Sequence, residues 1–565
     1  MPVRPYVPRA PLAKVVLVSD TTLNREYSHF PLLDFLPCAP SGLVPRVIWE
    51  FLKGKPPPSD HGRATVAPYA IRKLEAALLA RHSPDEVVVA HEDHLEDVIK
   101  DDTEVIGVNT MDPLGLGPLT MSYSVLFSDA SKPWVRVEFE SLMARLNKAR
   151  AGKRAKLVVG GPGVWELTVM PELMDTLGID LAFQGECDDI ANEVFEDIGS
   201  GAIWGSEYFR GYSSFGDQFR MSWVSHEKFA TRRPGQKQFP NLDEIPLIRG
   251  PTVKGLVEVM RGCGIGCDFC EVTLRPLRYY TPEMAMKEVA VNAHSGQASV
   301  WTHSDEIFAY KHGPHFVPNE EAIQELFKAI MSVRGVVSAN PTHGRISIPA
   351  AYPGLPLAVG RTVKASPKHW IGIQVGLETG SERLAQVHMP NKTLPLRIGP
   401  DGEWQEIVLQ GLKNLNRAYW RPAFTVQVGQ ADETPEDNWE TVRLVNRMSA
   451  LDVDGRPAEF TVTPMQNVPL GRIKSRKLNH DMLDSSQLAV YYACYAQLMR
   501  ITYRNAIRDS TGNLVKRAMV ASALGLGSWG LLRIVERICK KRGVDLEKVR
   551  RHGLERREEI RVIAR

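Results

Sequence analysis

This sequence contains few cysteines and no large excess of charge of either sign, two features that would by themselves indicate a class of protein. The chain has only 7 cysteines in 565 residues, an odd number, and three of them are clustered, so we do not expect a disulfide framework. Its 69 Lys and Arg residues nearly balance 66 Asp and Glu residues, which leaves a net charge of +3. A chain this close to neutrality is not expected to be a general nucleic-acid binder.

Long apolar runs are also missing. None reaches the roughly 20 residues that a membrane-spanning helix needs. Residues 1–14 contain four prolines and no apolar segment, so no signal peptide is expected. The composition, 43% hydrophobic and 24% charged, is typical of a soluble globular protein. The length is sufficient for two or three domains with substantial cores.

The most distinctive stretch is the segment 261–270. Cys263, Cys267 and Cys270 form a C-x3-C-x2-C array there, with glycine at positions 262, 264 and 266. Three thiolates at this spacing can converge on a metal cluster, and glycine allows the backbone to fold tightly around it. A cube of four irons normally has four ligands, so three cysteines leave one iron open. The alternatives are three unrelated cysteines or a zinc knuckle, but zinc needs a fourth ligand nearby and the next histidine, His294, is far off.

Strand-like and helix-like patterns alternate over the first 200 residues. Short β-branched runs occur at 14–20, 86–90, 104–109, 156–160 and 179–183, and helical periodicity occurs at 70–80 and 139–151. This alternation predicts a parallel, doubly wound sheet, and such sheets bind ligands beyond the carboxyl ends of their strands.

Three of these strand ends carry glycine-containing turns that suit close approach of a ligand, although such turns can also be structural. The candidate binding residues are Asp112, Gly115 and Gly117 after the third run, Gly160, Gly161 and Gly163 after the fourth, and Gly185 and Glu186 after the fifth.

A second set of strand-like runs follows the cysteine array. The runs lie at 255–260, 298–302, 344–348, 371–375, 424–428 and 459–463, with helical patterns at 282–293, 320–334 and 436–448. They predict a six-stranded parallel barrel, in which chemistry takes place in the loops at the carboxyl ends of the strands. The candidate residues in those loops are the three cysteines, Ser304, Asp305 and Glu306 after the second run, and Glu378 and Ser381 after the fourth.

The C-terminal region is basic and helical in pattern, over 488–508 and 513–541. Residues 500–565 include seventeen Lys and Arg but only seven Asp and Glu. The stretch 518–532 is uncharged, contains Trp529 and has basic flanks, so it could cover the barrel mouth or lie at an anionic membrane surface. Cys494 and Cys539 lack cluster spacing, so no second iron–sulfur site is expected.

The cysteine array resembles the radical S-adenosylmethionine (SAM) superfamily, and the order of motifs around it resembles the cobalamin-dependent class. Ahead of the array, a strand ending in Gly-Gly-Pro at 160–162, Pro-Glu-Leu at 171–173 and the Gly-Glu turn at 185–186 resemble a cobalamin-binding domain. After it, 376–381 resembles the G-x-E-T-G-S motif. Two departures are the absence of an Asp-x-His-x-x-Gly motif and Ala431 in place of a usual proline.

The resemblance implies an α/β fold with four parts. These are a Rossmann-like cobalamin-binding-type domain at 1–200, a linker at 201–250, a partial (β/α)6 radical SAM barrel at 251–475 and a basic helical region at 476–565. It implies a 4Fe-4S cluster on the three cysteines, with SAM and cobalamin as further cofactors. Phe269 would contact the adenine (a core aromatic is the alternative), Ser304, Asp305 and Glu306 would contact the SAM amino group and substrate, and Glu378 or Ser381 would contact the ribose hydroxyls.

The activity that this resemblance implies is reductive cleavage of SAM to a 5′-deoxyadenosyl radical that functionalises an unactivated carbon. Cobalamin-dependent methyl transfer is the leading hypothesis. The alternatives are ring formation on a membrane lipid, as in archaeal lipid ring synthases, and a non-catalytic corrinoid or iron–sulfur carrier. Expected partners are a small-molecule, peptide or lipid substrate and an electron donor such as ferredoxin or flavodoxin. An oxygen-sensitive cluster implies the cytoplasm, with possible peripheral membrane contact through the C-terminal region.

Overall fold

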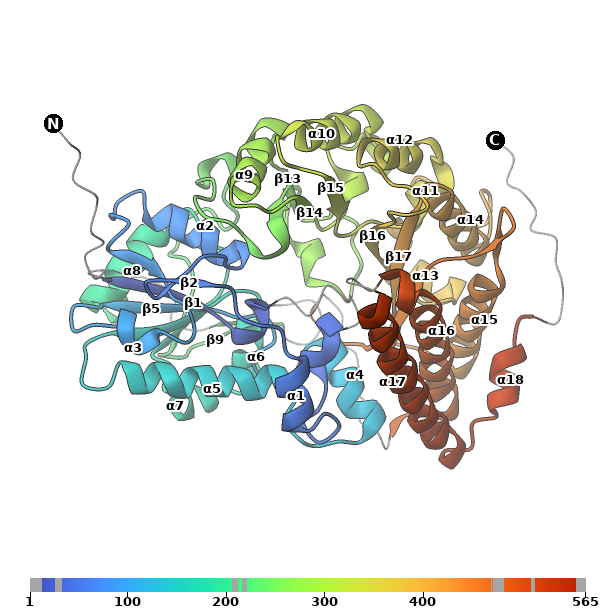
Figure 1. Cartoon of the computed structure of the whole chain (residues 1–565), viewed down its shortest axis with the longest axis horizontal. Coiled ribbons are helices and arrows are strands. Elements are labelled where there is room, and N and C mark those ends of the chain that lie inside the picture. The colour runs from blue at the N-terminus through green and yellow to red at the C-terminus, as the bar shows by residue number, and fades with distance from the viewer. Residues whose placement is uncertain are drawn as a thin grey trace.

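A six-stranded parallel sheet forms the N-terminal part of the molecule (Figure 1). The structure is a computed structural model and describes residues 13–25, 33–205, 212–215, 221–468, 470, 482–509 and 514–554. The strand order is β4-β1-β5-β6-β7-β10, and every pairing is parallel. The strands are β1 (Val15–Ser19), β4 (Val87–Val89), β5 (Val105–Asn109), β6 (Lys156–Gly160), β7 (Leu181–Phe183) and β10 (Phe229–Ala230).

Helices cover both faces of this sheet because each strand is apolar on both sides. Val16 and Val18 of β1 pack into one core, and Val15 and Leu17 pack into the other. The first core is closed by α3 (Leu95–Val98), α5 (Trp134–Ala149), α6 (Val164–Val169) and α7 (Leu173–Thr176), and the second by α2 (Tyr69–Leu78) and α8 (Ala191–Ser200). The expected doubly wound sheet is confirmed. Its order reverses between β1 and β5, where such folds place ligands.

Six further parallel strands form the partial barrel. The strands β11 (Leu256–Glu258), β14 (Ser299–His303) and β15 (Ser338–Pro341) make one sheet, and β16 (Ile371–Glu378), β17 (Trp420–Val428) and β20 (Thr461–Gln466) make another. A parallel bridge between His343 and Gln374 joins the two. The surrounding helices are α9 (Pro282–His294), α10 (Glu320–Ser332), α11 (Ser347–Ala351), α12 (Gly354–Thr362), α13 (Glu382–His388), α14 (Trp404–Arg417) and α15 (Pro435–Ala450).

One predicted barrel strand was wrong. The run 344–348 is not a strand; the third strand is β15, and α11 begins at Ser347. Alternating apolar residues suggested a strand, but Ile346 and Ile348 reach the barrel core from a loop and a short helix. The true strand has little β propensity, and its pairing with β14 fixes it. The other five predicted barrel strands are confirmed.

The remaining elements are short, apart from the C-terminal helices. The α-helices among them are α1 (Arg46–Leu52), α4 (Pro118–Phe127), α16 (Ser485–Asp509), α17 (Leu514–Lys541) and α18 (Leu546–Arg551). The strands form four separate pairs: β2 (Ser59–Asp60) with β3 (Arg63–Ala64), β8 (Tyr212–Phe215) with β9 (Met221–Val224), β12 (Met260–Arg261) with β13 (Arg278–Tyr279), and β18 (Asp452–Val453) with β19 (Arg456–Pro457). The pair β8–β9 and strand β10 lie within the predicted linker, so part of that segment extends the N-terminal sheet.

The C-terminal helices lie against the barrel. Helix α16 packs beside α15, α17 and β20, and its Tyr491 and Tyr495 belong to the same core as the barrel strands (Figure 1). No helix of the described residues is both long enough and apolar enough to cross a membrane.

Several contacts join the N-terminal sheet to the barrel, and two of them involve helices of the N-terminal part. Helix α4 follows β5 and packs against β20, where Val125 and Leu126 enter the barrel core and the Ser122 hydroxyl accepts a hydrogen bond of 2.5 Å from the Gln466 amide. On the other side, Lys73 of α2 donates to Glu288 of α9 at 2.9 Å, and both side chains are buried. The loop after β5 is therefore fixed with respect to the barrel.

Candidate functional site

The cysteine loop follows β11 and β12 at the carboxyl end of the first barrel strand. Gly262 and Gly264 have φ values of 81° and 66°, in the left-handed region. A Cβ atom on Gly262 would lie 2.5 Å from the Pro276 carbonyl oxygen, and one on Gly264 would lie 2.8 Å from Leu277. Both positions therefore require glycine, and the loop has little freedom to take another path.

The three thiols of this loop lie within electrostatic reach of one another. Burial, together with the charge of the nearby Cys270, raises the pKa of Cys263 and of Cys267 to about 12. Burial likewise raises the pKa of Cys270. Among the described residues, no group of three His, Cys, Asp or Glu side chains is placed to hold a metal ion. In an iron–sulfur cube each cysteine binds a different iron, so its thiols do not converge on one atom.

Two cations flank the thiols. Lys392 lies 3.0 Å from Glu378, and its charge lowers the pKa of Cys267 and of Cys270. Arg345 is 2% exposed, and the charges of Cys263 and Cys267 act on its guanidinium. Cations next to buried thiols favour the thiolate form, which is the form that binds metals. The donor set and its surroundings therefore fit a thiolate-bound cluster.

The residues predicted after the second barrel strand lie beside this loop. The Asp305 carboxylate accepts a hydrogen bond of 2.7 Å from the Gly262 amide. Ser304 is fully buried, and its hydroxyl has no hydrogen-bond partner. Glu306 accepts a hydrogen bond from the Phe308 amide, and burial, partly offset by the charge of Arg345, raises its pKa to about 6. The structure thus brings Asp305 to the cysteine loop, while the SAM and substrate roles of all three stay predictions.

The residues predicted after the fourth strand divide into two groups. Glu378 faces the thiols: its carboxylate contacts Lys392, accepts a hydrogen bond of 3.0 Å from Gln427, and raises the pKa of Cys267 and Cys270. Ser381 instead caps α13 and donates a hydrogen bond of 2.5 Å to Asp437. Arg383 also pairs with Asp437, so the surface ion pair between Glu378 and Arg383 that the sequence offers as an alternative to a ribose contact is not formed. Of the two, Glu378 has the better position for a ligand next to the thiols.

Two contacts from the end of α13 and the segment after it were not predicted. Asn391 donates a hydrogen bond of 3.0 Å to the Ile265 carbonyl, and the His388 ring lies 2.8 Å from Asp268, so both hold the cysteine loop. Phe269 packs partly buried against the barrel core. No sequence pattern marked Asn391, His388 or Lys392, because their function depends on contact with a loop more than a hundred residues away.

In the N-terminal sheet, the predicted glycines have different surroundings. A Cβ on Gly161 would lie 2.4 Å from Asn109, one on Gly163 would lie 2.6 Å from Pro113, and one on Gly115 would lie 2.3 Å from Pro133. These three glycines are needed for the turns themselves. Gly160 has open space around it, and Gly185 has only Thr231 nearby, at 3.8 Å. Neither Gly160 nor Gly185 is therefore required by close packing, and the predicted contact of both with a ligand stays a prediction.

Carboxylates hold the loops of this sheet together. Asp112 accepts a hydrogen bond of 2.9 Å from the Gly117 amide, and Glu166 accepts one of 2.7 Å from the Leu114 amide. Asp20, at the end of β1, accepts one of 3.2 Å from Thr110, and burial raises its pKa to about 6. Asp20 and Glu166 were not among the predicted residues, because buried acids that bind backbone amides leave no pattern in the sequence.

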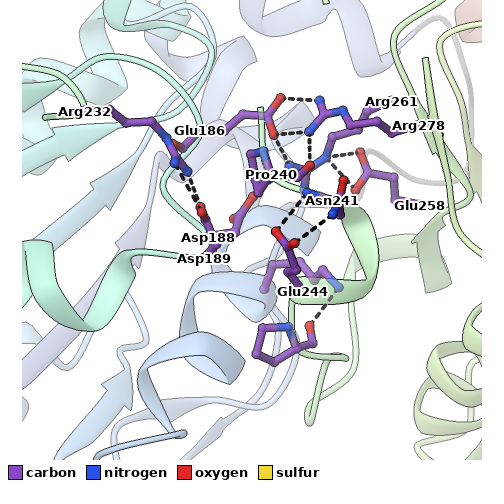
Figure 2. Close-up of polar contacts among 12 residues, drawn as sticks. Glu186, Asp188, Asp189, Arg232, Pro240, Asn241, Glu244, Glu258, Arg261 and Arg278 are labelled. Atoms are coloured by element: carbon purple, nitrogen blue, oxygen red, sulfur yellow. Dashed lines mark hydrogen bonds and ion pairs between the residues drawn. The ribbon is translucent and has the colours of Figure 1, made fainter. Parts of the chain in front are cut away.

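Glu186 lies at the junction with the barrel. Figure 2 shows its carboxylate facing Arg261, which directly precedes the cysteine loop, and Arg278, at 2.8 and 2.6 Å respectively. Arg261 also contacts Asp188 and Glu258. Burial would raise the pKa of Glu186, but hydrogen bonds from Arg278 and the charge of Arg261 outweigh it and hold this pKa below its usual value. Glu186 therefore joins the N-terminal sheet to the cysteine loop, and its predicted contact with a cofactor stays a prediction.

Glu186→Gln should destabilise the protein by roughly 3 kcal/mol at pH 7, because it leaves the largely buried Arg278 guanidinium without a carboxylate and removes one of the three carboxylates around Arg261. A carboxylate with a lowered pKa stabilises the fold above its ordinary pKa of 4.5, so the difference from wild type should shrink as the pH falls below 4.5. Urea unfolding at several pH values measures it. Glu283→Gln, which removes an exposed pair with Lys287, should change the free energy of unfolding far less. Equal effects of the two variants would contradict the role of Glu186.

Comparison with known proteins gives similarity of structure only. No protein-family model and no curated protein matches this sequence. Among solved structures, the radical S-adenosylmethionine methyltransferase TsrM from Kitasatospora setae, with tryptophan substrate and the SAM analog aza-SAM bound, has a TM-score of 0.50 and 14% identity. The alignment covers 94% of this chain and 99% of that chain.

Two further structures are less similar. TsrM with cobalamin and a [4Fe-4S] cluster bound has a TM-score of 0.48 and 15% identity, with the same coverage. Methylornithine synthase (PylB) has a TM-score of 0.28 and 13% identity and covers 43% of this chain and 62% of that chain. At these identities the comparison concerns the fold alone. The chain has the fold of the radical SAM methyltransferase with tryptophan and aza-SAM bound, and the expected fold class is confirmed.

Proposed function

We propose that this protein is a radical SAM enzyme that carries out cobalamin-dependent methyl transfer to an unactivated carbon. The observation that carries the proposal is the cysteine loop: three thiols, Cys267 buried and the other two partly buried, on a glycine-constrained turn at the carboxyl end of the first barrel strand, between the buried Arg345 and the partly buried Lys392. The fold shared with a radical SAM methyltransferase supports it. With the cluster bound, SAM would be cleaved reductively to methionine and a 5′-deoxyadenosyl radical that removes hydrogen from the substrate.

The side chains around the thiols have separate roles in this proposal. Cys263, Cys267 and Cys270 hold three irons of the cluster. Lys392 and Arg345 offset the negative charge of the thiolates, and Asp305 fixes the loop through the Gly262 amide. A carboxylate can accept two hydrogen bonds at once, so Glu378, which faces the thiols, is suited to the ribose hydroxyls of SAM.

The N-terminal sheet would hold the corrinoid. The open space next to Gly160 and Gly185 lies at the carboxyl ends of β6 and β7, close to the point where the strand order reverses. Helix α4 continues from the loop after β5 into the barrel core, so the loop and the barrel keep a fixed separation. Methyl transfer from a corrinoid at the sheet to a substrate held at the barrel would need such a fixed geometry.

Replacing any one of Cys263, Cys267 and Cys270 with alanine should abolish cluster uptake and formation of 5′-deoxyadenosine, because each thiolate binds its own iron. Anaerobic reconstitution, followed by the visible spectrum, iron and zinc analysis and mass spectrometry after reduction with SAM, measures this. Cys494→Ala, which removes a buried cysteine of α16, should keep both signals. A wild-type protein that binds zinc, or that binds no SAM and forms no 5′-deoxyadenosine, would contradict the proposal and favour a carrier.

Gly160→Leu should remove cobalamin binding and leave the cluster intact. Position 160 lies outside the left-handed region and has open space around it, so a leucine fits without strain but fills the proposed corrinoid space. The measurement is the spectrum of protein prepared with cobalamin and then desalted. Gly354→Leu, in equally open space on α12, should retain the corrinoid bands. If the wild type shows only iron–sulfur absorption, a corrinoid-free reaction is favoured instead.

One observation favours a second candidate, carbon–carbon bond formation on a membrane lipid. On α17, Val515, Met519, Leu526 and Trp529 recur at helical spacing on one face, and each is more than 60% exposed. Arg533 stacks on Trp529, and α17 carries six Lys and Arg but a single Glu. An exposed apolar stripe with basic residues at its ends is suited to the surface of an anionic bilayer.

Vesicle flotation tests this surface. Wild type should float with phosphatidylglycerol vesicles and not with phosphatidylcholine vesicles, because the basic residues need anionic lipid. Met519→Glu/Leu526→Glu should abolish flotation by placing charge on the stripe. Val337→Glu, at a site 56% exposed on the barrel, is the matched control and should float like wild type. Wild type that floats with neither phosphatidylglycerol nor phosphatidylcholine vesicles would remove the support for a lipid substrate.

A further inference from the structure

Arg345 is a buried cation that no sequence pattern singled out. It lies between β15 and α11, at the carboxyl end of the third barrel strand, and it is 2% exposed. Its guanidinium packs on the Phe316 ring, 4.8 Å from the centroid. The thiols of Cys263 and Cys267 are close enough to act on its charge, so it lies at the same face of the barrel as the cysteine loop.

The guanidinium of Arg345 is short of acceptors. It makes one weak hydrogen bond, 3.3 Å from Nη2 to the Phe316 carbonyl, while Nε and Nη1 are buried without a partner. The nearest acid, Glu306, lies 4.0 Å from Nε, beyond hydrogen-bond distance, and its carboxylate already accepts from Phe308. An unsatisfied buried guanidinium is costly, so native proteins rarely keep one without a ligand.

The second cation of this site differs in this respect. The Lys392 ammonium is 3.0 Å from Glu378 and is therefore paired within the chain. If the only need were positive charge next to the thiols, Arg345 could be paired in the same way. On the neighbouring strand end, the buried Ser304 hydroxyl is also unpartnered. Unused donors thus occur at two adjacent strand ends, β14 and β15, next to the thiols.

We propose that Arg345 is the receptor for a carboxylate that binds at the barrel mouth beside the cysteine loop. This inference rests on the proposed function and names the ligand chemistry of that site. An oxyanion would supply the missing acceptors to Nε and Nη1, and hydrogen bonds between ions are the strong ones. Two molecules could bring the carboxylate: SAM, through its methionine part, or the substrate.

Binding of SAM and of decarboxylated SAM to the reconstituted enzyme tests the first source. If SAM supplies the carboxylate, Arg345→Gln should weaken SAM binding roughly ten- to hundred-fold and leave decarboxylated SAM at its wild-type affinity. Arg345→Lys, which keeps the charge, should recover part of the loss. Arg361→Gln, on the exposed side of α12, should change neither affinity. Anaerobic equilibrium dialysis measures all four proteins, and circular dichroism checks that each is folded.

Acetate tests the second source. If the substrate supplies the carboxylate, all four proteins bind SAM equally, and acetate raises the melting temperature of SAM-saturated wild type relative to equal chloride but not that of Arg345→Gln. Normal affinity for SAM together with the same response to acetate in Arg345→Gln would overturn the inference. The inference would also be overturned if Arg345→Gln changed only the spectrum of the cluster, because the cluster itself would then be the group that contacts the Arg345 guanidinium. Failure of the proposed function would give a different result, because the wild-type protein itself would then take up no cluster and bind no SAM.

Discussion

The geometry of the site depends on how the cysteine loop is held. Glycine at 262 and 264 leaves the backbone one path, and four contacts fix that path in space. They are those of Arg261 with the acids around it, Asp305 with the Gly262 amide, Asn391 with the Ile265 carbonyl, and His388 with Asp268. These partners come from the N-terminal sheet, the second barrel strand and the segment after the fourth. The thiols are therefore positioned by the whole molecule, although they lie within eight residues of sequence.

The same contacts connect the two proposed cofactor sites. Glu186 belongs to the loop after β7 and binds the arginine that precedes the cysteines. On the opposite side, α4 runs from the loop after β5 into the barrel core. A ligand at the N-terminal sheet and a ligand at the thiols would thus be held by one continuous framework. Methyl transfer from a corrinoid at the sheet to a substrate at the barrel would need this rigidity, because small errors in the distance between donor and acceptor have a large effect on rate.

Charge at the barrel mouth is arranged unevenly. Glu378 and Lys392 satisfy each other, and Asp305 is bound to a backbone amide, whereas Arg345 and Ser304 keep unused donors. The unused donors are the groups left to a ligand, whereas Glu378 would bind the ribose hydroxyls in addition to Lys392 and Gln427. Ser381 shows the same distinction from the other side, because its hydroxyl is occupied by the capping of α13 and by Asp437.

The sequence by itself determined the order of the elements and the position of the cysteine loop. Periodicity identified all five predicted strands of the N-terminal sheet and five of the six barrel strands, because buried parallel strands are continuous apolar runs. It missed β15, whose short polar sequence becomes a strand only through pairing with β14. Only the tertiary structure decided which glycines face open space, that Glu186 joins two parts of the chain, and that Nε and Nη1 of Arg345 make no hydrogen bond. Burial and hydrogen-bond pairing depend on residues that are distant in sequence, so no local pattern could reveal them.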